Sequence, residues 1–126
     1  MKAMKSAYLR SKIVKHVKGE ASFTMPSNLY LAIYSSDPTI NDTGTEAAGG
    51  SYARQLLSFA AESNGSAFSN TSESFTMPAG TWTHWGIRDA SSGGNLMYFG
   101  QFDLNIVTAG GGTIPISSGD ISITEE

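Results

Sequence analysis

The sequence predicts a mainly β protein: a single antiparallel β-sandwich, jelly-roll-like or Ig-like, with an N-terminal amphipathic α-helix. The chain has 126 residues, of which 40% are hydrophobic, and it contains no cysteine. This length suits one domain whose core needs no disulfide. A helical period covers only residues 1–18, and short runs of alternating apolar residues follow Gly19. We therefore expect a basic N-terminal helix or arm at residues 1–19 and a β-sandwich domain at residues 20–126.

The first eighteen residues are predicted to form the helix. At 100° per residue, the apolar side chains fall on one arc and most of the lysines fall on the other. Gly19 provides a C-terminal stop. Because lysine recurs every few positions, a cleaved secretory signal is not expected, and no apolar run reaches the roughly 20 residues of a membrane span. The apolar arc holds Ala3, Ala7, Leu9, Ile13, Val14 and Val17.

Seven short segments have the pattern of β-strands. Residues 28–35 are apolar on both faces, which is typical of a central strand covered on two sides. Residues 81–89 and 95–104 are joined by a short Ser-Gly loop, which predicts a hairpin, and Gly100 marks a bulge or a close approach. A final hairpin is predicted for the last two segments. The segments are 28–35, 52–59, 73–77, 81–89, 95–104, 113–117 and 121–124.

Two connections, 36–51 and 60–72, are long. Loops of more than about 12 residues in a compact domain are usually functional, partner-bound or mobile. The first holds Asp37, Asn41, Asp42 and Glu46, whose oxygens are hard ligands, but their spacing differs from that of a twelve-residue calcium loop. Turn-forming, solvated acids are therefore favoured over a calcium site.

The net charge of −3 hides a sharp asymmetry. Residues 1–18 carry six bases and no acid, whereas residues 19–126 carry two arginines and eleven acids. Such a split can indicate a nucleic-acid or membrane arm, or an arm that docks on an acidic protein surface. The acidic body would repel DNA or RNA, and neither a specific nucleic acid nor a membrane is expected as a partner. The predicted docking residues are Lys5, Leu9, Arg10, Lys12, Ile13, Lys15, Val17 and Lys18.

No catalytic residue, cofactor or metal site is predicted. The chain lacks a Gly-x-Ser-x-Gly elbow, a phosphate loop, a dinucleotide fingerprint and a zinc motif. It has two histidines, His16 on the helix and His84 in a strand. We expect His84 to be a packed or interface residue rather than a catalytic one.

Four residues are candidates for an interface or for stacking on a glycan, namely Trp82, His84, Trp85 and Tyr98, and Phe99 could stack in the same way. Flat aromatic faces bind the apolar faces of sugars, but the same side chains commonly fill a core or a subunit interface. Packing is the favoured interpretation. Arg54 and Arg88, the two bases outside the helix, are expected to pair with specific carboxylates or backbone carbonyls.

Several short strings carry a resemblance that covers nearly the whole chain. They are YLRSKI at 8–13, FTMP at 23–26, NLYLAIY at 28–34, SDPT at 36–39, GTE at 44–46, GGSYARQ at 49–55, HWGIRDA at 84–90 and GGNL at 93–96. In order and spacing, these strings resemble a family of small tailed-bacteriophage structural proteins that are commonly labelled tail fibre proteins. The resemblance implies a non-enzymatic component of the virion.

The main expectation is a capsid cement or decoration subunit that bridges and stabilises neighbouring shell subunits. Its partners would be the major capsid protein or other virion proteins, and it would act as a homo-oligomer, with a trimer expected. One alternative is a tail-attached, fibre-type subunit that recognises a host-surface glycan. A third is an enzyme such as a cell-wall hydrolase.

Overall fold

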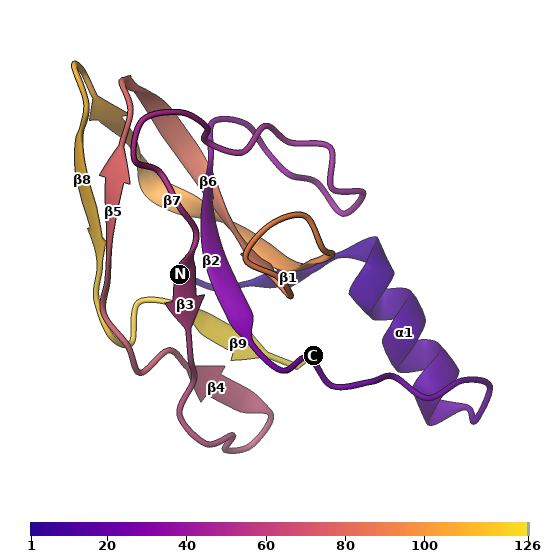
Figure 1. The fold of residues 1–126 in the computed structure, drawn as a ribbon. Coiled ribbons are helices and arrows are strands. Elements are labelled where there is room, and N and C mark those ends of the chain that lie inside the picture. The colour runs from indigo at the N-terminus through magenta and orange to yellow at the C-terminus, as the bar shows by residue number, and fades with distance from the viewer. Residues whose placement is uncertain (126) are drawn as a thin grey trace.

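The computed structural model describes residues 1–125, and these form a mainly β protein with one short helix (Figure 1). The predicted fold class is confirmed. The elements in chain order are β1 (Met4–Lys5), α1 (Ala7–Val17), β2 (Leu29–Tyr34), β3 (Gln55–Leu57), β4 (Ser66–Phe68), β5 (Glu73–Met77), β6 (Gly80–Arg88), β7 (Leu96–Thr108), β8 (Gly112–Ile116) and β9 (Ser122–Thr124).

The strands form one five-stranded antiparallel sheet and two antiparallel pairs. The order in the larger sheet is β1-β7-β6-β2-β3, and the pairs are β4-β9 and β5-β8. As predicted, β6 and β7 form a hairpin, and β2 lies inside the sheet between β6 and β3. Figure 1 shows β5 and β8 side by side as a layer next to the larger sheet.

The predicted hairpin between the last two strands is wrong. β8 pairs with β5 and β9 pairs with β4, so the two strands lie in different sheets. The turn between them bonds to the 60–72 connection: Gly119 N donates to the Ser69 carbonyl at 2.7 Å, and Ile121 N donates to Ser69 Oγ at 3.2 Å. Because these groups bind the connection that leads from β4, the chain is directed toward β4.

The main core joins the larger sheet to the β5-β8 pair. It contains Trp85, Leu31 and Ile87 from the sheet together with Phe75 and Ile114 from the pair, and each is at most 1% exposed. At about 25 cal/mol per Å² of apolar surface removed from water, these large side chains dominate the stability of the fold.

A second apolar layer lies on the other face of the sheet. Ala32, Tyr34 and Phe99 are buried yet lie outside the main core cluster, as alternation along β2 requires. The N-terminal end of α1 and the 36–51 loop meet at this layer, where Ala7 N donates to the Ile40 carbonyl at 2.8 Å. The prediction that residues 28–35 are covered on two sides is therefore confirmed.

The helix begins at Ala7, so the prediction of a helix over residues 1–18 is wrong for the first six residues. Their backbone pairs with strands instead: Ala3 N donates to the Ser122 carbonyl at 2.9 Å, and Ser6 N donates to the Met97 carbonyl at 3.0 Å. Ser6 then caps the helix, because its Oγ accepts a hydrogen bond from Leu9 N at 3.1 Å. The residues N-terminal to Ser6 thus belong to the β-structure.

Candidate interaction surfaces

The basic helix contacts the body mainly at its first turn. Leu9 is the buried residue of α1, whereas Val14 and Val17 are 60% and 79% exposed. Figure 1 shows α1 beside the sheets, with the connection from its C-terminal end running back to β2. The C-terminal part of the apolar stripe that the sequence predicts, at Val14 and Val17, is therefore uncovered.

The predicted docking residues divide into two groups. Those on the helix are Leu9, Arg10, Lys12, Ile13, Lys15 and Val17, with Lys18 as the C-cap of α1. Leu9 is 3% exposed, so it packs on the body of its own chain and is not presented to a partner. Lys5, in contrast, was predicted to lie on the docking helix, and the structure corrects that prediction.

Lys5 lies in β1 because its backbone pairs with Tyr98, and its ammonium forms an ion pair with Glu125. It therefore does not belong to the helical surface. Lys5 nevertheless lines a groove of about 800 Å³ beside α1. The walls of this groove are α1, β1 and the end of β9, and they combine bases with apolar side chains: Lys2, Ala3, Met4, Lys5, Arg10, Ile13, Val14, Thr124 and Glu125.

The two tryptophans are buried, so they cannot form a glycan platform. Trp82 is 5% exposed and Trp85 is 0% exposed, and both belong to the main core. Simple alternation would place residues 82 and 85 on opposite faces of the strand. A register irregularity between Trp82 and His84 changes the phase, so both indoles face the core.

Each indole has a specific neighbour. Trp82 Nε1 donates to Thr108 Oγ1 at 2.8 Å. Trp85 lies against Gly100, since a Cβ at that glycine would come within 2.3 Å of Trp85 Cζ2. The prediction that Gly100 is a point of close approach is therefore confirmed.

His84 and Tyr98 are half-buried rather than displayed on a flat surface. His84 Nδ1 shares a hydrogen bond with Thr83 Oγ1 at 2.6 Å, and no carboxylate contacts this histidine among residues 1–125. Burial raises the pKa of the Tyr98 phenol. Tyr98 also lines a groove of about 490 Å³ whose walls include Met25 and Leu56. These contacts do not bring His84 and Tyr98 together with an exposed tryptophan.

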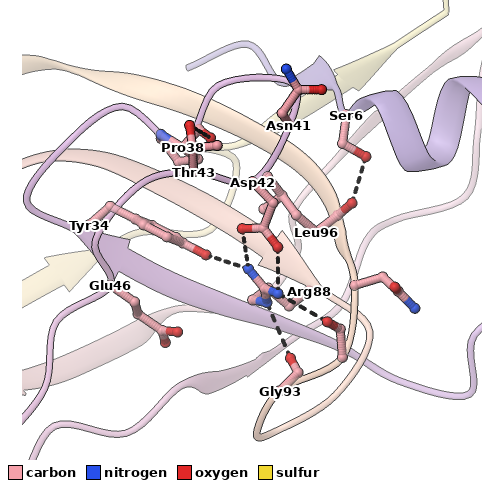
Figure 2. A network of polar contacts seen from close by, with 12 residues as sticks. Ser6, Tyr34, Pro38, Asn41, Asp42, Thr43, Glu46, Arg88, Gly93 and Leu96 are labelled. Carbon is pink, nitrogen blue, oxygen red and sulfur yellow. Dashed lines mark hydrogen bonds and ion pairs between the residues drawn. The ribbon is translucent and has the colours of Figure 1, made fainter.

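Arg88 holds the 36–51 loop against the sheet (Figure 2). Its Nη1 and Nη2 donate to the two carboxylate oxygens of Asp42, each at 2.8 Å, and Nη1 also donates to Tyr34 Oη at 2.9 Å. Its remaining donors reach the carbonyls of Gly93 and Gly94 in the β6-β7 loop. Burial alone would lower the pKa of Arg88, but the hydrogen bonds with Asp42 and Tyr34 raise it. The guanidinium therefore stays charged and joins two loops.

Arg54 makes a parallel set of contacts. Its Nε and Nη2 donate to the two carboxylate oxygens of Glu46 at 2.8 and 2.7 Å, and its Nη1 donates to the Ala90 carbonyl at 2.8 Å. Glu46 also accepts a hydrogen bond from Tyr52 Oη, and burial raises the pKa of that phenol. The expectation that both arginines pair with specific carboxylates is confirmed.

The acids of the 36–51 loop are therefore used for structure. Asp42 and Glu46 face arginines, and Asp37 Oδ1 accepts from Thr39 N at 2.8 Å. Within residues 1–125, no group of three or more His, Asp or Glu side chains is arranged to hold a metal ion. The same part of the chain contains no helix long and apolar enough to cross a membrane.

Sequence reasoning missed one exposed surface, which lies on β7. Leu104 is 82% exposed and lines a groove of about 390 Å³ together with Asp103, Ile106 and Asp120. Alternation from Phe102 would place Leu104 on the apolar face of the strand. No local signal marks its exposure, because polar neighbours such as Asp103 and Asn105 are what alternation expects beside a buried leucine.

Comparison with known proteins identifies the family of the chain. Residues 4–124 match the family model described as Podophage GP4 fiber I protein gp80. The comparison with curated proteins finds no match. The family match extends from β1 to β9 and so includes every helix and strand of the described residues. The chain therefore belongs to the podophage fiber I protein family and is a structural fibre component of the phage virion.

Proposed function

We propose that this chain is a non-enzymatic subunit of the tail fibre apparatus, and that α1 with the groove beside it attaches the subunit to neighbouring virion proteins. The match to a fibre protein family over residues 4–124 carries the proposal. It favours a place on the tail over the capsid cement role that we expected.

The exposed helix supports the attachment role. Val14 and Val17 present apolar surface beside Arg10, and the adjoining groove adds Met4, which is 53% exposed. An uncovered apolar patch rimmed by charge is typical of a protein-binding surface. The bases favour a partner whose surface carries carboxylates.

Glycan recognition by the tryptophans is not part of the proposal, because neither indole reaches the surface. A stacking site needs an exposed aromatic face. The described contacts likewise favour no catalytic role for His84, whose ring nitrogen meets a threonine hydroxyl. Zymograms on host cell walls should show no clearing, either for the wild-type chain or for His84→Ala.

Immunogold labelling and cryo-electron microscopy of intact particles test the placement. We expect antibodies against this chain to label the tail. Label distributed over the capsid shell would overturn the proposal and favour the cement role.

Attachment through α1 is tested separately by Val14→Asp/Val17→Asp. This variant should fold normally but be lost from purified particles, whereas the exposed control Ser11→Asp should be retained. Retention of both variants would show that α1 is not the attachment site.

A further inference from the structure

The protein carries two uncovered apolar surfaces of opposite charge. The first lies on α1, where Arg10 is at helical spacing from Ile13, Val14 and Val17, and where Arg10, Ile13 and Val14 also line the groove beside the helix. Arg10 is exposed, and its side chain has no ion-pair partner among residues 1–125. We call these four residues the helix face.

The second surface is the groove on β7, formed by Asp103, Leu104, Ile106 and Asp120, and we call it the β7 groove. Asp103 is exposed and has no ion-pair partner among residues 1–125. Asp120 is also exposed, and one of its carboxylate oxygens accepts from Ser117 N at 2.9 Å. The terminal ammonium of Met1 donates to the Asp120 carbonyl, so it offsets part of the negative charge.

A break in strand register creates the β7 groove. Trp82 pairs with Ile106 and His84 pairs with Gln101, so several residues of β7 lie opposite one residue of β6. The extra residues cannot all continue the ladder, and Asp103, Leu104 and Asn105 are exposed. Leu104 is consequently 82% exposed in the middle of the longest strand of the described chain.

We propose that the helix face of one copy of this chain docks in the β7 groove of a second copy. Arg10 would pair with Asp103, and Val14 and Val17 would cover Leu104. The proposal rests on the proposed attachment role of α1, and it names the neighbouring virion protein that α1 binds as a second copy of this chain.

Charge and apolar exposure both favour this pairing. On the helix face Arg10 lies one turn before Val14 and two turns before Val17, and the β7 groove combines Leu104 and Ile106 with two aspartates. Each surface therefore offers apolar groups next to a charge, and the two charges have opposite signs. The other large apolar groove, beside Tyr98, is lined by residues without charged side chains, so no electrostatic feature selects its partner. Because the helix face and the β7 groove are different surfaces, repeated docking generates a closed ring or a filament, and reciprocal docking generates a pair.

Sedimentation velocity of the purified full chain tests the proposal. The wild type should self-associate, and raising the salt from about 0.05 to about 0.5 M should weaken association. Arg10→Asp and Asp103→Arg should each weaken association roughly tenfold, because attraction becomes repulsion. Lys12→Asp is the matched control: it reverses a charge on the opposite side of α1, where Lys12 contacts the Tyr8 ring, and should leave association unchanged.

The reversed pair makes the test specific for a second copy. The double variant Arg10→Asp/Asp103→Arg should regain most of the wild-type association, because each reversed helix face meets a reversed β7 groove. The Arg10 and Asp103 side chains are exposed, so thermal unfolding of the variants at these two positions should match that of the wild type.

Three results would overturn the inference. A wild-type chain that stays monomeric at every accessible concentration excludes self-docking. Association that is insensitive to Arg10→Asp or Asp103→Arg places the contact elsewhere, and failure of the double variant to regain association shows that the two surfaces do not meet. None of these results bears on whether the chain lies on the tail, which particle labelling decides independently.

Discussion

Arg88 and Asp42 lie 46 positions apart in the sequence, yet two guanidinium nitrogens of Arg88 bind the two carboxylate oxygens of Asp42 at 2.8 Å each. The Arg88 side chain is 9% exposed and that of Asp42 is 36% exposed. The pair therefore fixes a long surface loop to a buried cation. Loss of this pair should therefore destabilise the protein more than loss of an exposed surface ion pair.

Asp42→Asn should lower the free energy of unfolding by about 2 kcal/mol, because it leaves the buried charge of Arg88 without its anion. Asparagine tolerates the positive φ of 58° at this position, so the backbone is preserved. Urea denaturation measures the change. Glu20→Gln, which removes the exposed ion pair with Lys18, is the control and should change stability by about 0.5 kcal/mol or less. Equal effects would show that the Arg88 pair contributes no more than a surface contact.

Gly100→Ala should lower stability by about 3 kcal/mol, because its Cβ would lie 2.3 Å from Cζ2 of the fully buried Trp85. Thermal unfolding monitored by tryptophan fluorescence measures the change. Gly112→Ala is the matched control, since its Cβ would meet Thr108 at an ordinary 3.5 Å and should cost little. A small effect at Gly100 would mean that Trp85 can move away without loss of packing.

Ser6→Ala should cost about 2 kcal/mol. The substitution removes the helix cap to Leu9 N and also leaves the Leu96 carbonyl without the hydroxyl that donates to it at 2.5 Å. Circular dichroism in urea gives the free energy. Ser11→Ala changes an exposed serine within α1 and should be neutral or slightly stabilising. If the two variants behave alike, Ser6 does not anchor the helix.

Glu73→Gln should stabilise the protein at neutral pH. Burial raises the pKa of the Glu73 carboxyl, although a hydrogen bond from the Thr71 hydroxyl opposes this shift. Because the pKa of Glu73 is higher in the folded state than in the unfolded state, its contribution to the free energy of unfolding is most favourable below the unfolded-state pKa. That contribution is lost as the pH rises through the folded-state pKa. The advantage of the glutamine variant should therefore be absent in acid and grow toward pH 7. Unfolding curves that differ by the same amount at every pH would contradict this assignment.

Part of the fold and one set of side-chain contacts could be predicted from the sequence. Local patterns in the sequence determined the mainly β class, the position of the two-sided strand β2, the β6-β7 hairpin and the family resemblance. These features depend on side-chain periodicity and turn residues that are close together in the chain. The pairing of Arg54 and Arg88 with carboxylates also followed from composition, because two arginines in an acidic body have many possible partners.

Tertiary structure decided the features that depend on strand register and on distant backbone partners. The irregularity beside Trp82 buries both tryptophans and exposes Leu104, and no periodic rule locates such a break. The Ser69 contacts direct β9 to β4, and the Ser122 and Met97 carbonyls draw residues 1–6 out of the helix. A backbone group pairs with whatever partner the fold brings near it. Sequence alone therefore located most of the longer strands. Tertiary structure decided the short strands β1 and β4, and also which strand side chains the protein buries and which it exposes.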